Sequence, residues 1–222
     1  IILPEIGGEG QNRLLKSKVL IIGVGGLGSP LLMYLAAAGV GNITIVDSDK
    51  VELSNLQRQI IHNMNEIGEP KVDSAKKFVK QMNPNINIES INSRIDDKNI
   101  NKLIKNSDIV ADCSDNFATR FLVADNCFQL KKTLVSAAIT KYEGQISTWK
   151  NKINLPCYRC LFPKEPNNTN LNNCSSNGVL GSVGGFFGSL QATEIIKEIL
   201  NIGHSLAGFL YIYDLLNNTS RK

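Results

Sequence analysis

Short apolar runs alternate along the chain with longer segments in which apolar residues recur at helical spacing. Four runs contain almost no polar residue, which is typical of parallel strands that are covered on both faces. They are Val19–Ile22, Ile43–Val46, Asp108–Cys113 and Thr133–Ala138. A further strand is predicted around Ile86 and Ile88, where apolar and polar positions alternate.

Helices are predicted between these strands. One opens at Pro70 and ends at Asn83-Pro84, and the apolar residues on its single face are Val72, Ala75, Val79 and Met82. The others begin after Gly28 or cover Ile100–Ile104, Phe117–Leu130 and about Gly185–Leu200. Strands that alternate with helices in this way form right-handed crossovers. The pattern therefore predicts an α/β fold with a Rossmann-like, doubly wound and mainly parallel sheet.

The remaining segments predict loops and a few shorter strands. Residues 1–18 show no clear element of their own, and Ser48 to about Glu69 is a long polar loop with room for one helical turn. A loop of that length in a compact domain is usually functional. Gly144–Trp149 and Phe209–Leu215 are predicted as additional strands, which extend the sheet in the antiparallel sense. The segment Asn151–Gly181 has little periodicity and is predicted as a crossover loop or lid.

The clearest chemical signal lies where the first predicted strand meets the first helix. Gly23, Gly25 and Gly28 have the spacing G-x-G-x-x-G. Glycines permit positive φ and let a phosphate approach the backbone, and the free N–H groups of the first helical turn attract the anion. Asp47 ends the next strand, at about the distance downstream where a carboxylate accepts hydrogen bonds from a ribose. These features predict a nucleotide site, although the motif does not distinguish NAD from ATP.

Composition bears on this interpretation in three ways. The stretch Val19–Gly41 has no charged residue and is long enough for a transmembrane helix, but its six glycines and Pro30 argue against a membrane span. The 222 residues are 42% hydrophobic and 20% charged, which is typical of one globular domain. The net charge of +4 is mild and the lysines are scattered, so nucleic-acid binding is not favoured.

Five cysteines without a secretory signal favour reduced thiols or a metal site in a cytoplasmic protein over a disulfide framework. Cys157-x-x-Cys160 has the spacing of half a tetrahedral zinc site, with a thioredoxin-like redox pair as the alternative. The irregular sequence around the pair favours a zinc knuckle. Cys113 and Cys127 lie on apolar elements, so we expect them in the core. Cys174 lies in a polar loop, where an exposed thiol could react.

Three charged residues indicate phosphoryl-type chemistry beside the nucleotide. Asp115 follows a parallel strand, at the sheet edge where doubly wound folds bind ligands, and could hold Mg²⁺. Arg58 and Lys71 could supply fixed positive charge to transition-state oxygens. A hydride-transferring enzyme usually needs a His or Lys near the nicotinamide, and the only histidines are His62 in the loop and His204 near the C-terminus.

A series of motifs follows the same order along this chain as in a known family. They are GVGGLG with Asp47, SNLQRQ (Ser54–Gln59), GEPKV (Gly68–Val72), DCSDN (Asp112–Asn116), EGQI (Glu143–Ile146), PCYRCLFP (Pro156–Pro163) and GSLQATEIIK (Gly188–Lys197). In that order they resemble the ThiF/MoeB/HesA family, the bacterial relatives of ubiquitin-activating enzymes. The resemblance covers nearly the whole chain.

The resemblance implies an adenylation reaction that uses ATP and Mg²⁺. The substrate would be the C-terminal Gly-Gly carboxylate of a small ubiquitin-like sulfur-carrier protein, and a sulfur donor protein would act afterwards in thiamine or molybdopterin biosynthesis. The position matching Asp47 binds ribose, and the position matching Asp115 holds magnesium. Asn55, Arg58 and Lys71 match positions that bind or polarise the phosphates. The expected nucleotide-binding set is Gly23, Gly25, Gly26, Gly28, Asp47, Asp49, Asn55, Arg58, Gln59, Lys71, Asp115 and Asn116.

The resemblance also implies a two-fold homodimer and a structural Zn²⁺. Family members usually carry an arginine just before the segment at which this chain opens and a second C-x-x-C just past its last residue, so we expect truncation at both ends. We expect one ATP-binding adenylation domain over residues 1–222. Its nucleotide half would cover about 1–140, and its carrier-binding half, with the zinc knuckle, about 141–222.

Three questions stay open at this stage. In thiamine-pathway relatives a cysteine matching Cys174 links enzyme to carrier, whereas molybdopterin-pathway relatives do not depend on it, and no residue decides between the pathways. One alternative function is an NAD- or FAD-binding oxidoreductase or redox sensor that uses Cys157 and Cys160. Another is a non-catalytic module that recognises a ubiquitin-like tail.

Overall fold

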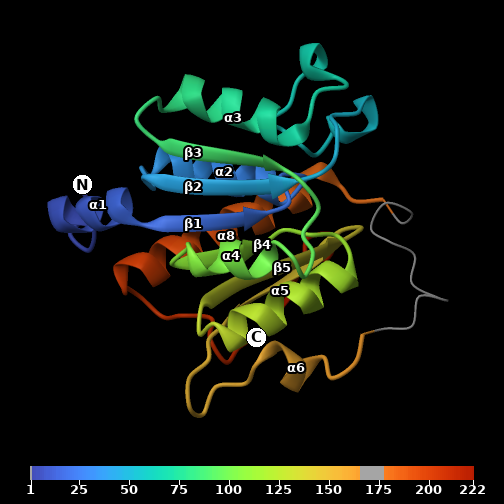
Figure 1. Ribbon diagram of the computed structural model, residues 1–222. Helices are drawn as coiled ribbons and strands as arrows, with labels where there is room; N and C mark the ends of the chain where they lie inside the picture. Colours follow the sequence, from blue (N-terminus) through green and yellow to red (C-terminus); the bar gives the residue numbers. More distant parts are fainter. Residues whose placement is uncertain (1, 166–177) are drawn as a thin grey trace.

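A single eight-stranded sheet organises the computed structural model, which describes residues 2–165 and 178–222 (Figure 1). The strand order is β3-β2-β1-β4-β5-β6-β7-β8. The strands are β1 (Lys18–Ile22), β2 (Asn42–Asp47), β3 (Asn87–Asn92), β4 (Ile109–Asp112), β5 (Thr133–Thr140), β6 (Glu143–Trp149), β7 (Tyr211–Asp214) and β8 (Thr219–Arg221).

The sheet is parallel from β3 to β5 and antiparallel from β5 to β8. Ile22, the last residue of β1, lies opposite Val46 of β2 and Asp112 of β4. The chain leaves β1 toward β2 and later returns to β4 on its other side, so the strand order reverses between β1 and β4. Such a reversal is where open α/β sheets bind ligands, outside the carboxyl ends of the strands. The predicted fold class is confirmed.

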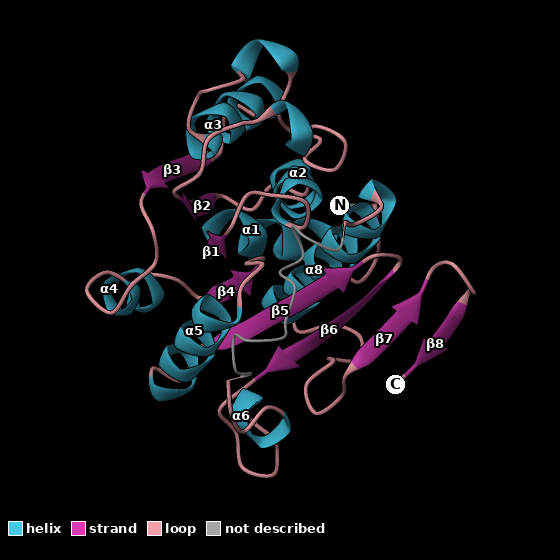
Figure 2. Ribbon diagram, turned by 90° about the vertical axis from the view of Figure 1, so that its right-hand side faces the viewer, coloured by secondary structure: helices cyan, strands magenta, loops and turns pink. Residues whose placement is uncertain are grey.

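Helices cover both faces of the sheet, as Figure 2 shows for α1, α2 and α8 on one side and α4 and α5 on the other. Strand β1 explains the two layers, because its alternate residues point to opposite faces. Val19 and Ile21 join the core under the first layer, whereas Leu20 and Ile22 join the core under the second. The helices are α1 (Gly7–Lys16), α2 (Gly28–Ala37), α3 (Lys71–Met82), α4 (Ile100–Lys105), α5 (Phe117–Gln129), α6 (Tyr158–Leu161) and α8 (Gly181–Leu200).

The N-terminal segment, for which the sequence predicted no element, forms helix α1. Its Gly-rich sequence is a poor helix former, but the helix packs on α8. Arg13 donates hydrogen bonds to the carbonyls of Ile199 and Leu200, at 2.5 and 2.6 Å. These are terminal carbonyls of α8, which have no partner within their own helix. The helix therefore forms through a contact 186 residues away in sequence.

Further elements also differ from the prediction. Helix α8 begins at Gly181, before the expected Gly185, and the short strand β8 was not predicted. The C-x-x-C segment forms the short helix α6. In the predicted long loop, two short 3-10 helices are present, η1 (Leu53–Asn55) and η2 (Met64–Glu66).

No helix within the described residues is long and apolar enough to cross a membrane.

Candidate active site

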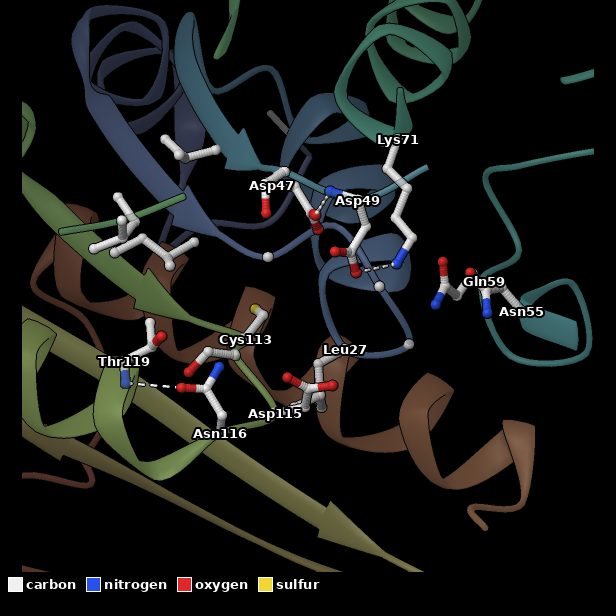
Figure 3. A pocket seen from close by; sticks show the side chains of 18 of the residues that line it. Leu27, Asp47, Asp49, Asn55, Gln59, Lys71, Cys113, Asp115, Asn116 and Thr119 are labelled. Atoms are coloured by element: carbon white, nitrogen blue, oxygen red, sulfur yellow. Dashed lines mark hydrogen bonds and ion pairs between the residues drawn. The ribbon is translucent and has the colours of Figure 1, made fainter. Parts of the chain in front are cut away.

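A cavity of about 590 Å³ lies at the carboxyl ends of β1, β2 and β4. Figure 3 shows side chains converging on it from β2, from the segment after β2, from the start of α3 and from the loop after β4. Eleven of the twelve predicted nucleotide-binding residues line this cavity. They are Gly23, Gly25, Gly26, Asp47, Asp49, Asn55, Arg58, Gln59, Lys71, Asp115 and Asn116.

The four glycines of the turn after β1 have two different roles. Gly23 has a φ of +90°, and a Cβ on it would lie 2.9 Å from the carbonyl oxygen of Cys113. Gly28 does not line the cavity, and a Cβ there would lie 2.0 Å from the Gly23 carbonyl. The nucleotide contact of Gly28 stays a prediction, and the structure adds a packing role for this glycine at the start of α2. Gly25 and Gly26 are not crowded, since an added Cβ would meet only side-chain atoms at 3.5 Å.

Asp47, at the end of β2, holds two backbone segments that border the cavity. Its Oδ2 accepts a hydrogen bond from the Val24 N–H at 2.9 Å, and its Oδ1 accepts one from the Asp49 N–H at 2.9 Å. Each carboxylate oxygen has two lone pairs, so both retain capacity for a further donor. The ribose contact stays a prediction, and the structure adds a role in fixing the glycine turn.

Lys71 lies in the first turn of α3, with 7% of its side chain exposed. Its ammonium group forms an ion pair with Asp49, with 2.8 Å between Nζ and Oδ2 (Figure 3). Both residues line the cavity, but they neutralise each other. An anion that binds Lys71 would therefore compete with the Asp49 carboxylate.

The segment after β2 supplies Arg58, Asn55 and Gln59. Arg58 donates from Nη1 to the Ser54 carbonyl at 3.2 Å, and no ion pair of Arg58 occurs among the described residues. Gln59 is 3% exposed, and its Oε1 has no hydrogen-bond partner within the ranges that the structure describes. A buried acceptor without a donor is costly, so a donor group of a bound molecule would stabilise this wall of the cavity.

Asp115 and Asn116 lie between β4 and α5. The Oδ1 of Asn116 caps α5 by accepting the Thr119 N–H at 2.9 Å. Asp115 is exposed, and in the described part of the chain its carboxylate has no hydrogen bond and no ion pair. An unpaired carboxylate that faces a cavity can hold a divalent cation such as Mg²⁺.

Two arginines of the cavity wall were not predicted from the sequence. Arg94 follows β3, another parallel strand, and its position at the same sheet edge was the available signal. Arg120 is 7% exposed and donates to the carbonyls of Ala137 and Ser114, at 3.1 and 2.6 Å. It fixes the turn that carries Asp115, but its contacts are visible only in three dimensions.

The cysteine pair lies outside this cavity. Cys157 precedes α6 and Cys160 lies within it, with 3.4 Å between the two Sγ atoms. Hydrogen bonds with the backbone and then the thiol of Cys157 lower the pKa of Cys160. No cluster of three candidate metal ligands occurs within the described residues.

The other cysteines have different outcomes. Cys113 and Cys127 are buried as predicted, and burial raises the pKa of both thiols. Cys113 also lines the cavity wall. Cys174 lies outside the described residues, so its predicted role in sulfur transfer is not tested.

Comparison with known proteins identifies relatives of this chain. The model of the ThiF family matches residues 1–222. The SAMP-activating enzyme E1 of Haloferax volcanii is 46% identical over 219 residues, which cover 99% of this chain and 80% of that protein. The sulfur carrier protein adenylyltransferase of Thermus thermophilus is 42% identical over 226 residues, which cover 100% of this chain and 83% of that protein.

Longer proteins contain the same unit. The chain is 42% identical to the adenylyltransferase and sulfurtransferase MOCS3 of Xenopus laevis and spans 49% of its length. Among solved structures, E. coli MccB with ATP superposes with a TM-score of 0.83 at 21% identity, over 95% of this chain and 64% of that one. That likeness supports the fold. Since the family model and relatives above 40% identity both extend over the whole chain, the chain belongs to the ThiF family.

Proposed function

We propose that this chain adenylates the C-terminal glycine carboxylate of a small ubiquitin-like sulfur-carrier protein, with ATP as the second substrate and pyrophosphate as the product. The observation that carries the proposal is the convergence of Arg58, Lys71 and Asp115 on one cavity around the glycine turn. Two relatives that match over nearly the whole chain are named for activation of SAMP and for adenylylation of a sulfur carrier protein.

The reaction needs charge neutralisation more than it needs a base. A C-terminal carboxylate has a pKa of about 3.5 and is already ionised at neutral pH, so no group has to remove a proton from it. The difficulty is that this carboxylate must approach an anionic phosphate. Fixed cations that face the phosphate would stabilise the charge that develops there, and each is worth about 3–4 kcal/mol of barrier.

The residues of the cavity fit ATP and a magnesium ion. Uncrowded Gly25 and Gly26 allow close approach of phosphates, and the Oε1 of Gln59, which has no partner among the described residues, would accept a hydrogen bond from a donor group of the nucleotide. Asp115 would hold Mg²⁺, which would supply positive charge at the phosphates when bound. Arg58 and Lys71 would bind the phosphates, Lys71 after releasing Asp49.

The test is ATP–pyrophosphate exchange in the presence of a carrier protein. We expect exchange only when the carrier is added. Asp115→Ala should lower it by about 100-fold or more, because the metal would lose its ligand. Asp97→Ala is the matched control, since Asp97 is an exposed aspartate outside the cavity. Unchanged exchange in the Asp115 variant would refute the role assigned to that residue.

The two alternative functions give different results in simple assays. An oxidoreductase would bind NAD or FAD tightly and ATP poorly, which a titration with each nucleotide detects. A non-catalytic binding module would bind the carrier without any exchange. Neither alternative uses Arg58, Lys71 and Asp115 together, and this set of side chains favours adenylation.

Several finer assignments belong to the same proposal. The chain would form one adenylation domain, with a nucleotide half at about 1–140 and a carrier-binding half at about 141–222. It would work in the cytoplasm as a homodimer, together with a sulfur donor protein.

Cys157 and Cys160 would supply two zinc ligands, because tetrahedral thiolates at about 2.3 Å from the metal lie roughly 3.8 Å apart, close to the 3.4 Å separation here. Zinc content per chain measures this directly.

The biosynthetic pathway is determined by the carrier protein that the chain adenylates. Exchange assays with thiamine-pathway and molybdopterin-pathway carriers, at equal concentration, would assign it. Cys174→Ser should leave exchange intact, because adenylation uses no nucleophilic side chain, and should impair sulfur incorporation only in a thiamine-pathway enzyme.

A further inference from the structure

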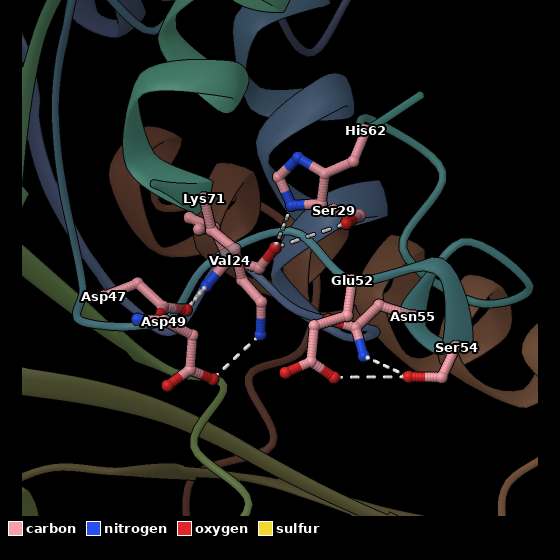
Figure 4. A network of polar contacts seen from close by, with 9 residues as sticks. All are labelled: Val24, Ser29, Asp47, Asp49, Glu52, Ser54, Asn55, His62 and Lys71. Carbon is pink, nitrogen blue, oxygen red and sulfur yellow. Dashed lines mark hydrogen bonds and ion pairs between the residues drawn. The ribbon is translucent and has the colours of Figure 1, made fainter. Parts of the chain in front are cut away.

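Both backbone polar groups of Val24, in the turn after β1, are held by hydrogen bonds, and Ser29 Oγ is one donor to its carbonyl oxygen, at 3.4 Å. Val24 donates its own N–H to Asp47 at 2.9 Å, and its carbonyl oxygen lies 3.3 Å from Nε2 of His62 (Figure 4). A trans peptide is planar, so its C=O and the following N–H point in opposite directions. A hydrogen bond at the Val24 carbonyl therefore sets the direction of the Gly25 N–H, and Gly25 lines the cavity.

His62 is itself held in place from behind. The imidazole is 6% exposed, and its Nδ1 lies 2.6 Å from the hydroxyl of Ser74, a fully buried residue of α3. The Ser74 Oγ lies 2.6 Å from Oε2 of Glu66. Glu66 is fixed in turn, since the same oxygen accepts the Asn63 N–H in the capping box of η2. Four contacts thus connect η2 and α3 to the glycine turn.

The chemistry of the contacts assigns the tautomer. A carbonyl oxygen can only accept, so the hydrogen bond to Val24 requires a proton on Nε2. Burial lowers the pKa of His62, and the charge of Lys71 lowers it further, which favours a neutral imidazole. His62 does not line the cavity, so it acts on a ligand only through the turn.

We propose that His62 is a positioning residue for nucleotide binding, which uses its Nε2–H to hold the Val24 carbonyl so that the Gly25 N–H faces the phosphates. This inference rests on the proposed function only in taking the ligand to be a nucleotide. It extends the binding machinery to a residue behind the cavity wall. Ser74 and Glu66 serve to orient the imidazole.

Two substitutions at the same position separate the roles of the two ring nitrogens. His62→Gln places an amide N–H near the former Nε2 and keeps a donor for Val24. His62→Asn is shorter, places its amide near the former Nδ1, and leaves the Val24 carbonyl with only the longer hydrogen bond from Ser29 Oγ, at 3.4 Å, among the described residues. We expect His62→Gln to bind ATP within about threefold of the unchanged protein. His62→Asn should bind ATP about tenfold more weakly, the order expected for one hydrogen bond.

Adenosine provides the control for general damage to the fold. Because the Gly25 N–H would face phosphates, adenosine affinity should be the same in all three proteins, measured by calorimetry on the full chain. Equal ATP affinity in the two variants, or a parallel loss of adenosine affinity, would overturn the proposal. If His62→Asn does not fold, Ser74→Ala replaces it, because the freed imidazole would weaken ATP binding selectively. These titrations need no carrier protein, so a lack of carrier-dependent exchange would count against the proposed function alone.

Discussion

Arg120 is a buried cation whose bonds go to backbone carbonyls behind the cavity, those of Ser114 and Ala137. We expect Arg120→Met to lower the free energy of unfolding by about 1–3 kcal/mol, because buried acceptors lose their donors while the volume is kept. ATP–pyrophosphate exchange should fall as well, since the turn that carries Asp115 would loosen. Urea denaturation measures the first effect. Arg221→Met, at an exposed arginine of β8, is the control and should change neither quantity.

His62 makes the free energy of unfolding depend on pH, and the surroundings of the imidazole determine whether this free energy rises or falls as the pH drops. Burial and the charge of Lys71 lower its pKa, although Glu66 and Asp47 act in the opposite direction. An unfolded histidine takes up a proton near pH 6.5, whereas the folded one does so only at lower pH. The free energy of unfolding should therefore fall as pH drops below about 7, by at most about 1.4 kcal/mol per pH unit from this group.

His62→Gln isolates that contribution. Its unfolding free energy should follow the unchanged protein above pH 7 and decline less steeply below it. The comparison uses denaturation curves at several pH values in one buffer series. Parallel curves over pH 5–8 would mean that the imidazole titrates alike in the folded and unfolded chain.

Site residues could be predicted from the sequence where consecutive secondary-structure elements fix their position. Gly23, Gly25 and Asp47 could be placed because a strand, a turn and a helix follow one another within 25 residues, and the structure brings them to one cavity. The packing role of Gly28 could not be predicted, because its neighbour, the Gly23 carbonyl, is apparent only once the turn is folded. Arg120 was missed for a related reason, since its partners lie on the loop after β4 and on β5.

At the scale of elements, helix α8 packs directly against the glycine turn and α2. A Cβ on Gly188 would lie 2.4 Å from both the Leu27 carbonyl oxygen and Cγ of Pro30. We expect Gly188→Ala to lower the free energy of unfolding by about 1–3 kcal/mol, because α8 must move away from the start of α2. ATP affinity should fall too, since Leu27 belongs to the turn and lines the cavity.

Gly185 supplies the matched control on the same helix. A Cβ there would meet no atom of the described residues within 4 Å. Gly185→Ala should raise the free energy of unfolding by about 0.5–1 kcal/mol, because alanine loses less conformational freedom in a helix than glycine does. Both values come from urea denaturation. A loss of stability in the Gly185 variant equal to that of Gly188→Ala would refute the packing argument.

The elements themselves were predicted best where a hydrophobic pattern was long and uninterrupted. Every predicted strand exists, and the four apolar runs that indicated strands covered on both faces form β1, β2, β4 and β5. Helix α1 could not be predicted, since its Gly-rich sequence has weak intrinsic preference and its partner α8 lies at the other end of the chain. Helix α8 begins earlier than expected, at Gly181, where an added Cβ would lie 2.2 Å from the Gln57 carbonyl oxygen, a close approach that the sequence does not show.

At the scale of the whole molecule, the site is assembled by the reversal of strand order between β1 and β4. This reversal places the turn after β1, which carries Gly25, beside the loop after β4, which carries Asp115. The connection between β2 and α3 then brings Arg58 and Lys71 to the same cavity. Within the described residues, one protomer therefore provides all three of the charged groups assigned to phosphates and magnesium.

The assignment of the three charged groups to one protomer leads to a prediction about the homodimer proposed for this chain. We expect sedimentation at micromolar concentration to give twice the chain mass of 24.3 kDa. We also expect that Lys71→Ala and Asp115→Ala chains, mixed and allowed to exchange subunits, show no more exchange activity than their separate residual activities. Each cavity draws Lys71 and Asp115 from the same chain, so every cavity in a mixed dimer would carry one defect. Restored activity would show instead that the two residues act across the dimer interface, and a monomer that keeps its activity would contradict the assembly itself.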